Sequence, residues 1–109
     1  MADDAAATAG SDTTTIDQIV ARVIAEVSPA ELNHVAPEQR LVADLGYHSL
    51  LLIELAFALE DLFAMDISLA NPPPIDSVRG VQRYILDRVR AGEAIVPDNA
   101  AVTEFFTRP

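Results

Sequence analysis

Residues 44–51, Asp-Leu-Gly-Tyr-His-Ser-Leu-Leu, hold the side chains best suited to chemistry. We expect Ser49 at the start of a helix, after a loop that contains Gly46, with its hydroxyl exposed. The N-terminus of a helix offers unpaired backbone amides and the positive end of the helix dipole. A phosphate attached to the Ser49 oxygen would be stabilised by both. The alternative is that Ser49 only caps the helix, and local chemistry leaves both interpretations open.

Hydrolase and metal chemistry fit the sequence less well. His48 and Ser49 are adjacent, and neighbours at a helix start point in different directions, so they do not form a nucleophile–base pair. The Gly-x-Ser-x-Gly motif of serine hydrolases is absent. His34 is the only other histidine, and the acidic residues follow neither zinc nor calcium ligand spacing. We therefore expect no catalytic residue and no bound metal.

Composition and charge exclude several classes of function. The chain has 109 residues, enough for one domain, and a formal net charge of −10. Such a surface repels nucleic acid and anionic membranes. Cysteine is absent, so the chain has no disulfide and no thiol nucleophile. No apolar run is long enough to span a bilayer, and residues 1–12 lack the features of a signal peptide. We expect a monomeric cytoplasmic protein.

The chain divides into a domain and two tails. Residues 1–13 contain no large apolar side chain after Met1, which predicts a disordered acidic tail. Residues 14–91 form the domain, and residues 92–109 are predicted to be a flexible C-terminal tail. The alternative for this last segment is that it folds back on the domain or onto a partner, because it carries Ile95, Val96, Val102, Phe105 and Phe106.

Helical spacing of apolar residues predicts three main helices and no strand. The first has a capping box at Thr15 and Gln18 and ends before Pro29. The second runs over about residues 49–64. The last is capped by Asp76 or Ser77 and ends near Gly92. Residues 71–74, Asn-Pro-Pro-Pro, leave room for at most one irregular turn before it. The fold class is therefore all-α, a small antiparallel helical bundle.

Two faces of the second helix separate when residues are placed at 100° steps. One face is assigned to the core and comprises Leu52, Leu55, Ala56, Leu59, Leu62 and Phe63. The opposite face mixes large apolar residues with acids and comprises Leu50, Glu54, Phe57 and Asp61. Because no lysine or arginine lies between Arg40 and Arg79, this face is acidic as well as apolar. It is typical of a docking surface for basic partners.

The chain resembles the acyl and peptidyl carrier proteins over roughly residues 15–91. The resemblance rests on residues 37–46 (Pro-Glu-Gln-Arg-Leu-Val-Ala-Asp-Leu-Gly) and on His48-Ser49-Leu50. It continues through residues 53–55, 59–63 and 66–68, and through Tyr84-Ile85 in the last helix. It implies a four-helix bundle of acyl-carrier type, with a short and irregular third helix beside the three main ones.

The resemblance also implies a function. A 4′-phosphopantetheine from coenzyme A would be attached to Ser49, with Asp44, His48 and Leu50 beside it, and its thiol would carry an acyl or aminoacyl thioester. Partner enzymes would bind the helix that begins at this serine, through positions that correspond to Leu50, Glu54, Phe57, Glu60 and Asp61. These partners would be a phosphopantetheinyl transferase, an activating ligase and downstream synthase enzymes.

Two positions depart from the family pattern. His48 replaces the aspartate that precedes the serine in fatty-acid carriers and is similar to peptidyl carriers. Pro72-Pro73-Pro74 lies where the family has its short third helix. We predict a discrete carrier protein, not an enzyme, for fatty acid, polyketide or nonribosomal peptide biosynthesis. The alternative is an unmodified, carrier-like module for protein–protein interaction.

Overall fold

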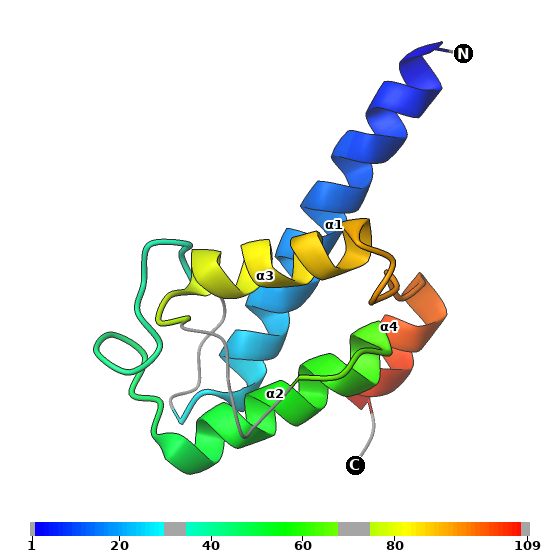
Figure 1. Cartoon of the computed structure of the whole chain (residues 1–109). Coiled ribbons are helices and arrows are strands. Elements are labelled where there is room, and N and C mark those ends of the chain that lie inside the picture. Colours follow the sequence, from blue (N-terminus) through cyan, green and yellow to red (C-terminus); the bar gives the residue numbers. More distant parts are fainter. Residues whose placement is uncertain (1, 30–34, 68–74, 108–109) are drawn as a thin grey trace.

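The computed structural model describes residues 2–29, 35–67 and 75–107, with side chains from Thr13 onward. These residues form four helices, α1 (Ala2–Val27), α2 (Ser49–Phe63), α3 (Val78–Arg90) and α4 (Asn99–Thr107), and no strand (Figure 1). α1 packs against both α2 and α3, and α4 packs against α2. The predicted all-α bundle is confirmed. No helix in the described part of the chain has the length and apolar character needed to cross a membrane.

The apolar stripe of α1 supplies one wall of the core. Its side chains at Ile16, Ile19, Val20, Val23 and Ile24 are buried. The end of the helix at Val27 agrees with the prediction from Pro29, but the predicted cap at Thr15 is wrong because the helix continues through that residue to Ala2. Residues 2–13 form the first turns of α1 in the structure, and the disorder of this acidic tail stays a prediction. Alanine, which is frequent there, has the highest helix propensity of all residues, and Figure 1 shows these turns extending beyond the bundle.

The second helix turns its apolar arc toward the core, as predicted. Leu55, Ala56, Leu59, Leu62 and Phe63 are buried. Leu52, at the first turns of the arc, is only partly buried and packs against the edge of the core. Placing the residues at 100° steps, as on a helical wheel, therefore gave the correct buried arc but overestimated burial at its N-terminal end.

The segment between α1 and α2 closes one end of the bundle. Val35, Leu41 and Leu45 are buried there. Val42, on the same segment, is 60% exposed. The loop is joined to the segment before α3, since Leu41 N donates to Asp76 O at 2.9 Å. This connection fixes the position from which α2 starts.

The third helix begins and ends where the sequence predicted. Ser77 is the N-cap, and its side chain accepts a hydrogen bond from Gly80 N at 3.1 Å. Gly92 follows the helix with φ +78°, a left-handed conformation that glycine adopts at little cost. The inward stripe of Val78, Val81 and Ile85 is buried. Arg79, Arg83 and Arg90 on this helix are exposed, whereas Arg88 is partly buried.

The C-terminal segment is folded onto the domain, in contrast to the predicted flexible tail. Ile95 N donates to Phe63 O at 2.8 Å, and Asp98 Oδ1 accepts from Ala101 N at 2.8 Å at the start of α4. The guanidinium of Arg22 lies 4.0 Å from the centroid of the Phe106 ring. Of the two alternatives for the C-terminal segment, the structure shows residues 92–107 folded back on the domain. Its apolar side chains supply the reason, because Val102, Phe105 and Phe106 pack on the core.

The four helices are therefore not the four that the family resemblance implied. The fourth helix of the structure is α4, at the C-terminus. The short third helix was expected around Pro72-Pro73-Pro74, and this segment lies outside the described residues.

Candidate functional site

Ser49 is the first residue of α2, and its side chain is exposed. His48 occupies the N-cap position with φ −128° and ψ 178°, and its side chain makes no capping hydrogen bond. Ser49 is therefore not the cap, and that alternative is excluded. Within the described part of the chain, the Ser49 hydroxyl makes no hydrogen bond. This hydroxyl is open to a reaction partner from solvent.

Unpaired backbone donors lie at the start of α2, where Ser49 stands. The hydrogen-bond ladder of α2 begins with Leu52 N, which donates to His48 O at 2.9 Å. The amides of Ser49, Leu50 and Leu51 precede this bond and have no acceptor among the described residues. Together with the helix dipole, they favour a negative charge at this end of α2. A phosphodiester on the Ser49 oxygen fits such an environment.

The loop before Ser49 is held by its own hydrogen bonds. Asp44 Oδ2 accepts from Arg40 N at 2.7 Å, which closes a turn. Tyr47 N donates to Leu41 O at 2.8 Å, and the Tyr47 hydroxyl donates to Ile24 O at 2.7 Å. Asp44 thus shapes the loop that leads to Ser49 through this hydrogen bond. Tyr47 ties this loop to α1.

Burial keeps the Tyr47 phenol uncharged and bonded to α1. Only 2% of its surface is exposed. Desolvation, with a smaller contribution from the Glu54 carboxylate, raises the pKa of Tyr47 above its usual value near 10. The phenol therefore keeps its proton at neutral pH and continues to donate to α1. The residue two positions before Ser49 is fixed in the core, while His48 and Ser49 are exposed.

The outer face of α2 is exposed as the sequence predicted. Leu50 is 60% exposed and Phe57 is 54% exposed, with the exposed acids Glu54 and Asp61 on the same face. Ile53 adds to it with 39% exposure. We call these five residues the outer face of α2. Exposed aromatic and aliphatic side chains beside carboxylates are typical of surfaces that dock basic proteins.

Glu60 does not belong to this face. Its side chain is partly buried, and Glu60 Oε2 accepts a hydrogen bond from Ile67 N at 2.7 Å. The carboxylate holds the chain that leaves α2. The family resemblance placed Glu60 among the partner-binding positions, whereas the helical wheel by itself had not.

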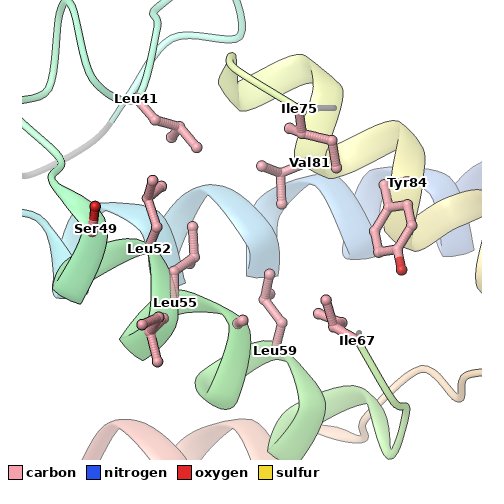
Figure 2. Close-up of a pocket in the computed structure, with 11 residues that line it drawn as sticks. Leu41, Ser49, Leu52, Leu55, Leu59, Ile67, Ile75, Val81 and Tyr84 are labelled. Carbon is pink, nitrogen blue, oxygen red and sulfur yellow. The ribbon is translucent and has the colours of Figure 1, made fainter. Parts of the chain in front are cut away.

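An apolar cavity of about 520 Å³ opens beside Ser49. α2 lines one side and α3 the other, and Figure 2 shows side chains from both converging on it. Ser49 lies at one end and Tyr84 at the other. The other lining side chains among the described residues carry no polar atom; they are Leu41, Leu52, Ile53, Leu55, Ala56, Leu59, Ile67, Ile75 and Val81. The space suits a hydrocarbon chain that starts at the end of α2.

Sequence reasoning missed two parts of this site. Ile53 could have been found on the wheel, because it lies three residues after Leu50 and four before Phe57 on the same surface. Tyr84 could not, since its place in the cavity depends on how α3 packs across from α2. Among the described residues, no group of three or more histidine, aspartate or glutamate side chains is arranged to hold a metal ion.

Comparison with known proteins agrees with this geometry. Residues 18–71 match the family described as "Phosphopantetheine attachment site". An acyl carrier protein of Helicobacter hepaticus is 35% identical over 71 residues, which cover 65% of this chain and 92% of the relative. One of Helicobacter pylori (strain G27) is 40% identical over 65 residues, covering 60% and 83%. No solved structure is significantly similar. The chain therefore belongs to the acyl carrier protein family, whose cofactor is a covalently attached 4′-phosphopantetheine.

Proposed function

We propose that Ser49 bears the 4′-phosphopantetheine and that this protein moves thioester-bound acyl or aminoacyl intermediates between the enzymes of a fatty acid, polyketide or nonribosomal peptide pathway. The observation that carries the proposal is the Ser49 hydroxyl, which is exposed and makes no hydrogen bond within the described residues. It stands beside unpaired amides at the start of α2 and at the mouth of an apolar cavity. The protein acts as a carrier and not as a catalyst.

Loading would transfer the phosphopantetheinyl group of coenzyme A to the Ser49 oxygen, with 3′,5′-ADP leaving and the hydroxyl proton lost. When bound, the group supplies a thiol, which the chain lacks because it has no cysteine. The amides of Ser49, Leu50 and Leu51 favour the negative charge of the phosphodiester. Asp44 acts on the site through the loop, because its carboxylate is bonded to Arg40 N.

We propose that His48 and the outer face of α2 contact partner proteins. The transferase must approach Ser49 closely, and the exposed imidazole of His48 stands directly before it. Leu50, Ile53 and Phe57 would supply apolar contacts, while Glu54 and Asp61 would attract a basic partner. A long flexible arm then brings the thioester to each enzyme at a high effective concentration.

The cavity between α2 and α3 supports a second part of the proposal. The part of its lining that the structure describes is apolar except at Ser49 and Tyr84. A carried acyl chain would leave water by entering it, which gains about 25 cal/mol for each Å² of apolar surface buried. Entry would also shelter the thioester between encounters with partner enzymes.

The test is the intact mass of the protein before and after incubation with coenzyme A, magnesium and a phosphopantetheinyl transferase of broad specificity. We expect a gain of one phosphopantetheinyl group, and no gain when coenzyme A is omitted. Refusal by one transferase calls for a second, because His48 replaces the aspartate of fatty-acid carriers. Refusal by both, with retained binding of a partner protein, would favour the alternative of an unmodified interaction module.

A further inference from the structure

Tyr84 gives the apolar cavity one polar end. Among the described lining residues, only Ser49 and Tyr84 have polar side-chain atoms. Figure 2 shows Tyr84 on α3 at the end of the cavity away from Ser49, facing Ile67. A phenylalanine would fill the same space without a polar atom. The hydroxyl therefore needs hydrogen-bond partners from outside the apolar lining.

The hydrogen bonds of Tyr84 leave its proton available. Arg88, one helical turn later, donates from Nη1 to the Tyr84 hydroxyl oxygen at 2.8 Å. Arg88 also donates from Nη2 to Asp66 O at 3.1 Å and forms an ion pair with Glu93, with Nε 2.7 Å from Oε1. The tyrosine oxygen thus accepts from a cation that is itself held in place. Its own proton goes to no acceptor among the described residues.

Two consequences follow for a chain inside the cavity. A hydrogen bond from a charged donor polarises the phenol and makes its O–H a stronger donor. A saturated chain that displaced water from Tyr84 would leave this donor without an acceptor, which costs more than an ordinary hydrogen bond gains. A chain with an oxygen atom at that depth would satisfy it.

We propose that Tyr84 makes the cavity selective for acyl chains that carry a keto or hydroxyl oxygen far from the thioester, by donating its hydroxyl proton to that oxygen. The distal position follows from the length of the cavity. Its lining runs along α2 from Ser49 to Leu59, a rise of about 15 Å at the usual helical pitch. The inference rests on the proposed function, because the chain reaches the cavity from an arm on Ser49.

The experiment uses the full chain loaded with defined cargo. Phosphopantetheine thioesters of a medium-length saturated chain, and of the same chain with one ketone near its far end or beside the thioester, are attached to the unaltered protein and to Tyr84→Phe. The rate at which an excess of β-mercaptoethanol cleaves each thioester, by thiol exchange that leaves the ketone intact, reports how much the cavity protects it. The quantity of interest is the ratio of the two proteins' rates for each cargo.

We expect the thioester of the distal-ketone cargo to be cleaved about two- to tenfold faster in Tyr84→Phe than in the unaltered protein, which corresponds to the loss of one neutral hydrogen bond. The thioester of the saturated cargo should be cleaved at an equal or lower rate in Tyr84→Phe. Equal ratios for the three cargoes would overturn the proposal. Tyr47→Phe is the matched control, since it loses a tyrosine hydroxyl that does not line the cavity and should change all cargoes alike.

A second measurement needs no substitution at the cavity. The ¹³Cζ resonance of Tyr84 in labelled, unaltered protein responds to hydrogen bonding by its hydroxyl. It should differ between the distal-ketone cargo and the saturated cargo, and identical resonances would contradict the proposal. If the protein is loaded but shows no dependence on cargo, the proposed function stands and only this inference is overturned. If the protein accepts no phosphopantetheine, both are overturned.

Discussion

Two helices of this protein begin with nearly the same backbone and a serine in a different register. The N-cap of α2 is His48, with φ −128° and ψ 178°, and the N-cap of α3 is Ser77, with φ −129° and ψ 162°. Ser77 uses its oxygen to accept from Gly80 N. Ser49 comes one residue after the cap, and its hydroxyl makes no hydrogen bond among the described residues.

With the proposed attachment at Ser49, one residue type would stabilise a helix at one position and carry a prosthetic group at the other. A serine at the N-cap satisfies an orphan amide and stabilises its helix, so its oxygen is occupied. A serine in the first helical position leaves that amide unsatisfied and keeps its oxygen free. α2 gives up a cap at the point where an attached phosphate would take the same amides.

The largest effect should separate the two serines directly. Ser49→Ala should abolish loading with phosphopantetheine, whereas Ser77→Ala should load at the normal rate. Stability should respond in the opposite order. Ser77→Ala loses a cap and about 1 kcal/mol of unfolding free energy, while Ser49→Ala stays within about 0.5 kcal/mol. Intact mass and urea unfolding measure the two properties, and loading of Ser49→Ala would break the comparison.

The second effect concerns the charge of the surfaces that follow the two helix starts. The outer face of α2 carries Glu54 and Asp61, whereas α3 carries Arg79, Arg83, Arg88 and Arg90. Glu54→Arg should slow association with the transferase by about three- to tenfold at low ionic strength, and the loss should shrink in high salt.

The matched control is Asp87→Arg, which makes the same charge change at an exposed position on α3. Association rates measured by stopped flow at several salt concentrations decide the point. Equal slowing by both variants would show that net charge, and not the outer face of α2, steers the partner.

A cap can be added to α2 to make the two helix starts alike. His48→Ser places a serine where α3 has Ser77, and we expect a gain of about 1 kcal/mol in unfolding free energy, measured in urea. In the double variant His48→Ser with Ser49→Ala, loading should remain absent, because the new hydroxyl would be occupied as a cap. Loading at residue 48 would show that register does not decide which serine reacts.

The smallest effect concerns the anchor before the site. Tyr47→Phe should cost about 1 kcal/mol, since one hydrogen bond is lost while Ile24 O still accepts from Ser28 N at 3.1 Å. Because the pKa of Tyr47 is raised in the folded state, its contribution is present below the usual tyrosine pKa and is lost as pH rises above about 10. Above about pH 10, the free energy of unfolding measured in urea should fall less steeply with pH in Tyr47→Phe than in the unaltered protein. Equal slopes would contradict this role.

Much of the fold and the outer face of α2 could be predicted from sequence because both depend on periodicity within one helix. The wheel found the buried arc around Leu55 and Leu59 and the exposed pair Leu50 and Phe57. It failed where tertiary contacts decide. Thr15 has the sequence of a cap, yet the helix passes through it.

The same limit applies to the ends of the chain and to the cavity. Phe106 packs beside Arg22 of α1, 84 positions earlier in the chain, and no local pattern connects them. Tyr84 faces the cavity only because α3 lies across from α2 on the common support of α1. Glu60 looked like a surface acid, but its carboxylate holds Ile67 N.

The most direct test of the central claim is the position of the modification in the loaded protein. Tandem mass spectrometry of a digest distinguishes Ser49 from Ser11, Ser28, Ser68 and Ser77. We predict that phosphopantetheine is found only on the peptide that contains Ser49, with the fragment ions placing it on that residue. Modification of any other serine, or of none after treatment with two transferases, would contradict the account.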